Sequence, residues 1–304
     1  MTVDKKTTKN APLIVIVGPT ASGKSAVAMQ IAEQFGGEII AADSRTVYKD
    51  MDIGTAKPTP DDRQKVPHWG LDIATPGDTF TAADFKRYAT EKIKEIRARG
   101  NIPMLVGGTG LYVDGVVFDY QFGAPNPALR KELEQLSIEE LQERCRKSGI
   151  PLPENSTNRR HLQRVLEQGV INTDRQRQPL ENTLIVGIAT DPQELRERIT
   201  TRAEEFFEGG MIEEAVRLGE AYGWDSEAMT GNAYPLVKLF LDGEIGEVEL
   251  KERFVTSDWR LTKRQRTWLK RNSFIHWKSR EQAFDFIAKH LEGAGCVRIR
   301  EYKK

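Results

Sequence analysis

The chain has 304 residues, and its 45 basic and 45 acidic side chains give a formal net charge of zero, so no overall field draws it to nucleic acid. No apolar run approaches the roughly 18 residues of a membrane-spanning helix, and the polar segment 1–10 lacks the apolar core of a secretory signal. Cys145 and Cys296 share no motif with other metal-ligating residues, which indicates free thiols in a cytoplasmic protein.

The most informative stretch is an apolar run, Leu13–Val17, that leads directly into Gly18-Pro-Thr-Ala-Ser-Gly23-Lys24-Ser25. This loop matches the phosphate-binding pattern of Gly, four residues and Gly-Lys-Ser/Thr. Its backbone N–H groups can surround an anion, and the helix predicted over 25–35 points its positive end at the same place. The strand before the loop and the helix after it argue against a chance glycine-rich turn. The residues expected to bind a phosphate or diphosphate are Gly18, Thr20, Ala21, Ser22, Gly23, Lys24 and Ser25, and Ser25 also offers its hydroxyl to Mg²⁺.

Two further strands are predicted at 38–42 and 102–106, followed by Asp43-Ser44 and by a second glycine-rich turn that contains Thr109. The carboxyl ends of parallel strands meet at one edge of a sheet, so Asp43 and Thr109 should lie beside the phosphate loop. Asp43 could bind magnesium through water or accept a proton from a substrate, and a turn or N-cap aspartate is the alternative. Thr109 fits a ligand contact and a helix N-cap equally well.

The character of the sequence changes near Asp114. Short predicted helices and polar stretches follow, with an arginine group at 159–164, until the strand pattern returns at 184–188. We therefore predict an α/β fold with a parallel sheet interrupted by a mostly helical insertion. The expected boundaries are 11–114 and 183–290 for the core, 115–182 for the insertion, and 1–10 and 291–304 for the tails.

The C-terminal part is predicted to be helical. Asp191-Pro-Gln-Glu194 starts a helix on which Arg198 and Arg202 share a face and could bind a diphosphate, although a solvated helix face would give the same spacing. Within 260–271, six of the twelve residues are basic and none is acidic, and Trp268 lies among them. Basic side chains interleaved with aromatic ones suit a nucleic-acid backbone and an unstacked base; the alternative is a solvated helix with core tryptophans.

In series, these motifs resemble the tRNA dimethylallyltransferase family. The resemblance is carried by GPTASGKS at 18–25, Asp43-Ser44, MDIGTAKP at 51–58, VGGTGLY at 106–112 and KRQRTWLKR at 263–271, in the family's order over nearly the whole chain. It implies a core similar to that of phosphate-loop NTPases, with a parallel sheet flanked by helices and an inserted helical domain.

The resemblance also implies a reaction, in which the dimethylallyl group of dimethylallyl diphosphate moves to the N6 amine of the adenosine 3′ to a tRNA anticodon. Lys24, Arg202 and Mg²⁺ on Ser25 would neutralise the leaving diphosphate. Asp43 would accept a proton from the amine, and Thr109 would lie between the substrates. The implied contacts to the tRNA anticodon stem-loop are Asp43, Ser44, Arg45, Thr46, Thr109, Arg130, Arg160, Arg164, Tyr234, Lys263, Arg264, Gln265, Thr267 and Trp268.

Two positions depart from the family pattern. Ala233-Tyr234-Pro235 stands where the family usually has Gly-Tyr-Arg, and Thr46 stands where many members have glutamine. Two other functions would use the same loop: a small-molecule kinase would bind ATP there, and a nucleotide-regulated RNA-binding protein would not need Asp43 for catalysis. The presence of Asp43, Thr109 and the phosphate loop together favours the transferase over both alternatives. We further expect the protein to work with Mg²⁺, without a membrane and as a monomer.

Overall fold

The computed structural model describes residues 11–124, 126–170, 174–231 and 233–299. The chain forms two compact units. The larger unit combines the chain up to Val117 with the chain from Pro179 onward, and the smaller one is Phe118–Gln178, within the expected insertion 115–182. No helix among the described residues is long and apolar enough to cross a membrane.

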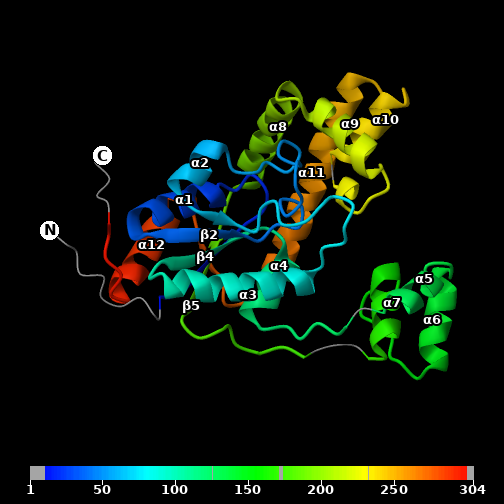
Figure 1. The fold of residues 1–304 in the computed structure, drawn as a ribbon, viewed down its shortest axis with the longest axis horizontal. Coiled ribbons are helices and arrows are strands. Elements are labelled where there is room, and N and C mark those ends of the chain that lie inside the picture. Colours follow the sequence, from blue (N-terminus) through cyan, green and yellow to red (C-terminus); the bar gives the residue numbers. More distant parts are fainter. Residues whose placement is uncertain (1–10, 125, 171–173, 232, 300–304) are drawn as a thin grey trace. The chain divides into compact units, whose positions relative to one another are not determined.

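A six-stranded parallel sheet forms the centre of the larger unit (Figure 1). Its strand order is β3-β2-β4-β1-β5-β6, and the central strand β1 pairs with β4 and β5. The strands are β1 (Leu13–Val17), β2 (Gly37–Ala41), β3 (His68–Trp69), β4 (Ile102–Gly107), β5 (Thr183–Ile188) and β6 (His276–Lys278). Parallel strands are covered on both faces, which explains the uninterrupted apolar runs of β1 and β4. The predicted α/β architecture is confirmed, and the sequence pattern missed only the two short edge strands β3 and β6.

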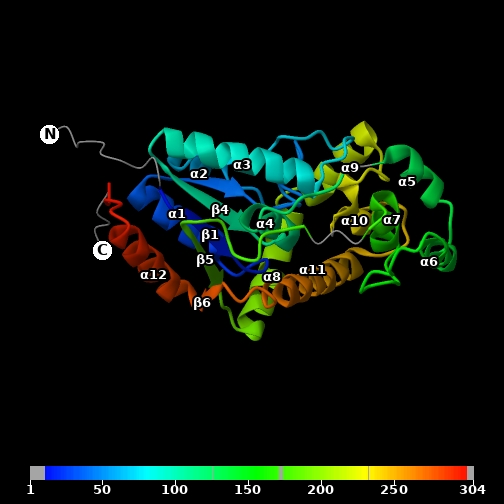
Figure 2. The same ribbon diagram turned by 90° about the horizontal axis from the view of Figure 1, so that it is seen from below.

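Helices cover both faces of this sheet (Figure 2). On one face, α1 (Lys24–Phe35) and α12 (Arg280–Gly293) pack on Ile14 and Ile16 through Ile31 and Ile287. Side chains alternate along a strand, so Val15 points to the opposite face. There lie α3 (Ala82–Ala98) and α4 (Gly110–Val117), whose rings Phe85 and Tyr112 stack with centroids 4.3 Å apart.

The remaining helices of the larger unit gather at one end of the sheet (Figures 1 and 2). They are α8 (Pro192–Glu208), α9 (Met211–Tyr222), the short 3₁₀ helix η1 (Ala228–Thr230), α10 (Tyr234–Leu241) and α11 (Glu247–Leu269), and the short α2 (Pro60–Lys65) lies earlier in the chain. Helix α8 begins as the sequence predicts, because the Asp191 side chain accepts hydrogen bonds from Gln193 N and Glu194 N.

The core extends beyond the boundary expected at residue 290. Leu291 is fully buried, Cys296 is also part of the core, and Ile299 N donates a 2.7 Å hydrogen bond to Gln34 O. The apolar residues of α12 recur at intervals of four and continue the buried face past residue 290. The expectation of a tail is therefore wrong for 291–296, and the expected tail segments 1–10 and 300–304 lie outside the described residues.

The described residues of the smaller unit form three helices, α5 (Pro127–Leu133), α6 (Ile138–Lys147) and α7 (Arg159–Gln168). They share a core of Leu133, Leu141, Cys145 and Leu162. A capping box starts α6, since the Ser137 side chain accepts from Glu140 N and the Glu140 side chain accepts from Ser137 N.

Candidate active site

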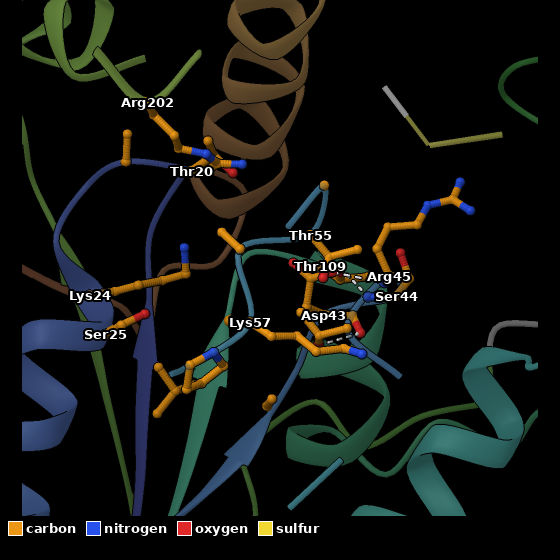
Figure 3. Close-up of a pocket in the computed structure, with 18 of the residues that line it drawn as sticks. Thr20, Lys24, Ser25, Asp43, Ser44, Arg45, Thr55, Lys57, Thr109 and Arg202 are labelled. Atoms are coloured by element: carbon orange, nitrogen blue, oxygen red, sulfur yellow. Dashed lines mark hydrogen bonds between the residues drawn. The ribbon is translucent and has the colours of Figure 1, made fainter. Parts of the chain in front are cut away.

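A cavity of about 790 Å³ lies in the larger unit where β1, β2 and β4 end. The loops after these strands form part of its wall, and α8 and α11 close it. Figure 3 shows Lys24 and Ser25 on one side of this cavity and Asp43, Ser44 and Thr109 on the other. The predicted site residues that line it are Thr20, Ala21, Gly23, Lys24, Ser25, Asp43, Ser44, Arg45, Thr46, Thr109, Arg202, Tyr234, Arg264 and Gln265.

The phosphate loop has the backbone conformation of an anion-binding turn. Ala21 and Gly23 both have left-handed φ angles, 63° and 86°, a geometry in which successive N–H groups converge on a concave surface. Ser22 lies between them but is fully buried, and a Cβ on Gly18 would lie 2.5 Å from its Oγ. Gly18 and Ser22 thus pack on each other and are not part of the cavity wall, although both were expected to bind the diphosphate.

Two cations face the cavity from different elements. The ammonium of Lys24 at the start of α1 donates to Pro19 O at 3.3 Å. The pKa of Lys24 is lowered to about 8, chiefly by burial and also by the Arg202 cation, while Asp43 and Asp258 act in the opposite direction. Arg202 of α8 approaches Asp258 at 3.7 Å, and its Nε is buried without a hydrogen-bond partner among the described residues. Such a pair of incompletely neutralised cations fits a diphosphate.

Arg198, one helical turn before Arg202, has other hydrogen-bond partners. Its guanidinium donates to Ala21 O at 3.1 Å and also pairs with Glu194. Both arginines line the cavity, but Arg198 is tied to the phosphate loop, whereas Arg202 extends into the cavity (Figure 3). The sequence spacing treated the two arginines alike, and the structure separates their roles.

Asp43 and Thr109 are held together by the ends of β2 and β4. Ser44 N donates to the Thr109 hydroxyl at 3.1 Å, and Asp43 Oδ1 accepts from Arg45 N at 2.8 Å. A Cβ on Gly107 would lie 2.1 Å from Ala42 O, so only glycine permits this close approach of the two turns. Thr109 O accepts from Tyr112 N and Val113 N at the start of α4, so Thr109 begins this helix while its hydroxyl links the helix to the turn after β2.

The loop Met51-Asp-Ile-Gly-Thr-Ala-Lys57 forms another wall of the cavity and is anchored from both sides. The Lys57 ammonium donates to Tyr48 O, Asp52 and Asp72 at 2.6 to 2.9 Å. The buried Glu214 carboxylate of α9 accepts from the backbone N–H groups of residues 52, 53 and 54 at 2.8 to 2.9 Å. Sequence reasoning missed Glu214, and the available signal was a glutamate on the apolar face of α9.

Three residues expected to contact tRNA form hydrogen bonds to other residues of the larger unit. Tyr234 is 1% exposed, and its hydroxyl donates to Glu214 at 3.0 Å. Arg45 Nη1 donates to Glu227 O at 2.7 Å, which ties the loop after β2 to η1. Thr46 is buried, and its hydroxyl donates to Asp43 O at 3.5 Å. These side chains support the cavity wall, so the expectation of a tRNA contact is not supported for Tyr234.

The basic stretch lies on the second half of α11. Lys263, Arg264 and Thr267 are exposed. Trp268 is 37% exposed, and its indole Nε1 donates to Asp114 at 2.7 Å. A Cβ on Gly110 would lie 2.1 Å from the Trp268 ring, so the indole packs directly against the start of α4. Gln265 turns toward the cavity, and its Oε1 accepts from Thr20 N at 2.8 Å.

The smaller unit has its own cluster of arginines. Arg130 makes two hydrogen bonds, 2.5 and 2.7 Å long, to the fully buried carboxylate of Glu167, and Arg164 approaches the same carboxylate at 3.4 Å. Arg160, on the same helix as Arg164, is exposed. The three arginines expected to contact tRNA thus divide into two that hold a buried acid and one that faces solvent.

Comparison with known proteins identifies the family to which the chain is similar. The family model described as IPP transferase matches residues 46–272. A tRNA dimethylallyltransferase of Bacillus velezensis is 34% identical over 95% of this chain and 97% of that relative, and one of Streptococcus mutans is 38% identical over 88% and 92%.

Solved structures give the same result. A tRNA Δ(2)-isopentenylpyrophosphate transferase of Staphylococcus epidermidis aligns with a TM-score of 0.72 and 31% identity, covering 94% of this chain and all of that one. A eukaryotic dimethylallyltransferase acting on tRNA, 22% identical, supports the fold with a TM-score of 0.77. Since the family model spans most of the chain and relatives above 30% identity match it nearly end to end, the chain belongs to the IPP transferase family, the tRNA dimethylallyltransferases.

Proposed function

We infer that this chain transfers the dimethylallyl group of dimethylallyl diphosphate to the N6 amine of the adenosine 3′ to the anticodon in tRNA. The observation that supports this most is the division of one cavity into two chemically different sides (Figure 3). Lys24 and Arg202 offer positive charge beside the phosphate loop, and Asp43 offers a carboxylate beside Thr109. One side suits a leaving diphosphate and the other suits a nucleophile that must lose a proton.

On the donor side, the diphosphate accepts hydrogen bonds from the loop N–H groups and pairs with Lys24 and Arg202. As the carbon–oxygen bond breaks, these cations stabilise the charge that develops on the leaving group. Ser25 is exposed and lines the cavity. Its hydroxyl fits Mg²⁺, which binds through few protein ligands together with phosphate oxygens and would supply further charge neutralisation.

On the acceptor side, the adenine amine forms the new carbon–nitrogen bond and gives its proton to Asp43. An exocyclic amine is a weak nucleophile, so a positioned base is of direct value. The bond from Ser44 N to Thr109 fixes the backbone beside Asp43. To reach the cavity the adenine must leave its stack, as in other enzymes that modify bases.

We propose that the tRNA is held by the exposed basic residues of α11 and by the helical unit. Lys263 and Arg264 on α11 and Arg160 on α7 are exposed and suit contacts to phosphates. Arg130 and Arg164 contact the RNA with the parts of their guanidinium groups that Glu167 does not cover. The Arg130 side chain remains 41% exposed beside this acid.

The decisive experiment is incubation of the purified chain with unmodified tRNA, Mg²⁺ and radiolabelled dimethylallyl diphosphate. The expected result is label in tRNA and release of one diphosphate per label. Absence of label in tRNA, together with ATP consumption in the presence of a small acceptor, would instead establish the kinase that uses the same loop. Transfer that requires neither Asp43 nor Lys24 would refute the roles assigned to this cavity.

A further inference from the structure

The side chain of Gln265 lies between the two glycine-rich turns of the cavity. Its Oε1 accepts a 2.8 Å hydrogen bond from Thr20 N, a contact between residues 245 positions apart in the chain. Its amide group also touches the second turn, since a Cβ on Gly108 would lie 2.5 Å from Gln265 Nε2. The same added Cβ would lie 3.1 Å from Gly18 O, so the two turns themselves come close here.

These two turns hold different substrates in the proposed reaction. Thr20 begins the curve of the diphosphate loop, next to the left-handed Ala21. Gly108 directly precedes Thr109, whose hydroxyl accepts from Ser44 N beside Asp43. A single carboxamide therefore contacts the donor's loop and the acceptor's turn.

We propose that Gln265 is a positioning residue that sets the separation between the diphosphate loop and the Gly108–Thr109 turn, and hence between the donor carbon and the adenine amine. The proposal deepens the proposed function and depends on it. Reaction requires the two atoms to be held at about 3–3.5 Å, and a displacement of about 1 Å can cost about 10²-fold in rate. The neutral carboxamide suits this place, because it offers an oxygen to Thr20 N–H without adding negative charge beside the diphosphate.

A role in positioning differs from a role in binding RNA. The neighbours Lys263 and Arg264 are charged and exposed, whereas Gln265 is neutral and half-buried, although Arg264 and Gln265 both line the cavity. Loss of an RNA contact would weaken tRNA binding, whereas loss of positioning would slow transfer once both substrates are bound.

The test uses Gln265→Ala and Gln265→Met, of which the second keeps the length of the side chain and removes both polar atoms. We expect the single-turnover transfer rate at saturating tRNA and dimethylallyl diphosphate to fall about 10²-fold in each variant. The dissociation constants for inorganic pyrophosphate and for tRNA should change less than about threefold. Gln30→Ala, an exposed glutamine on α1, is the matched control and should keep the wild-type rate.

A double-mutant cycle with Gly108→Ala adds a readout that a general loss of stability would not move. In the wild-type background the new methyl group displaces the carboxamide and should slow transfer. In the Gln265→Ala background the same substitution should cost at least fivefold less, because the severe 2.5 Å contact is gone and only the milder 3.1 Å approach to Gly18 O remains. Equal costs in both backgrounds would overturn the proposal.

Other outcomes are equally clear. A wild-type transfer rate in Gln265→Ala, or weaker tRNA binding with an unchanged rate at saturation, would show that Gln265 does not position the two turns. Failure of the proposed function itself would be seen separately, as the absence of label transfer by the unaltered chain.

Discussion

The phenol of Tyr234 donates a 3.0 Å hydrogen bond to the buried carboxylate of Glu214. Burial raises the pKa of Tyr234, and the neighbouring Glu214 raises it further, so the phenol stays protonated and remains a donor. Through Glu214 this contact extends to the backbone of the loop that walls the cavity. A side chain expected to touch RNA therefore belongs to the internal support of the site.

Removal of Glu214 should destabilise the larger unit. In Glu214→Ala the three N–H groups of residues 52, 53 and 54 lose their acceptor, and we expect the free energy of unfolding to fall by about 3 kcal/mol or more. Tyr234→Phe removes one donor and should cost about 1 kcal/mol. Urea unfolding measures both changes, with the exposed neighbour Glu213→Ala as a control near zero. A loss below about 0.5 kcal/mol in Glu214→Ala would contradict the anchoring role.

Replacement of Asp43 should affect chemistry more than binding. If Asp43 accepts the amine proton, Asp43→Asn should lower the transfer rate by about 10²–10⁴-fold, with the affinity for pyrophosphate nearly unchanged. The control is Asp50→Asn, at an exposed position whose left-handed φ of 61° asparagine also tolerates. Single-turnover assays measure the transfer rate. An Asp43→Asn rate within threefold of wild type would show that Asp43 is not the base.

The Lys24 ammonium makes diphosphate binding sensitive to alkaline pH. Its pKa of about 8 means that the free enzyme loses this charge as the pH rises from 7 to 9. We expect the affinity for pyrophosphate to fall over this interval relative to Lys24→Arg, whose guanidinium stays charged. Isothermal titration at several pH values tests this, because the ionisation of pyrophosphate is common to both proteins. Parallel pH profiles for the two proteins would refute it.

The same residue also makes folding depend on pH. The pKa of Lys24 falls from 10.5 to about 8 on folding, so the unfolded chain binds more protons between these pH values. The free energy of unfolding therefore rises with pH across that window. Burial of the charged Lys24 lowers this free energy most below pH 8. Lys24→Met should accordingly raise the free energy of unfolding at pH 7, by about 1 kcal/mol or more. Thermal unfolding at pH 7 and pH 10 should show that the difference shrinks at the higher pH.

The arginines of the helical unit should respond differently to substitution. Arg160→Ala removes an exposed charge and should weaken tRNA binding, with the slope of log affinity against log salt smaller by about 1. Glu167→Ala leaves Arg130 and Arg164 without their shared buried acid, and should lower the stability of this unit by about 3 kcal/mol. Filter binding over a salt series and chemical unfolding separate the two effects. A stability loss in Arg160→Ala equal to that in Glu167→Ala would contradict this division.

The sheet and the grouping of the site followed from local patterns. Apolar runs marked β1, β2, β4 and β5, and the rule that parallel strands end at one edge placed Asp43 and Thr109 beside the phosphate loop. Apolar runs and glycine-rich turns are visible in short stretches of sequence, so they can be recognised without knowledge of distant contacts.

The contacts of individual side chains could not be predicted in this way. The bonds of Gln265 to Thr20 and of Trp268 to Asp114 join residues more than 150 positions apart, and no local pattern encodes such a pair. Arginine spacing likewise gave Arg164 and Arg160 the same weight. Only Glu167, one turn beyond Arg164, hinted that one of them is paired.

Helix α11 has a further consequence that comes from its length. The stretch 247–259 has four acidic and two basic residues, and 260–271 has six basic residues and no acidic one. The 23-residue helix therefore separates opposite charges along an axis of about 35 Å. A polyanion that approaches it feels a torque, which turns phosphates toward the basic half, where Arg264 lines the cavity, and away from the acidic half before any contact forms. A chain without net charge can thus still orient its RNA during the encounter.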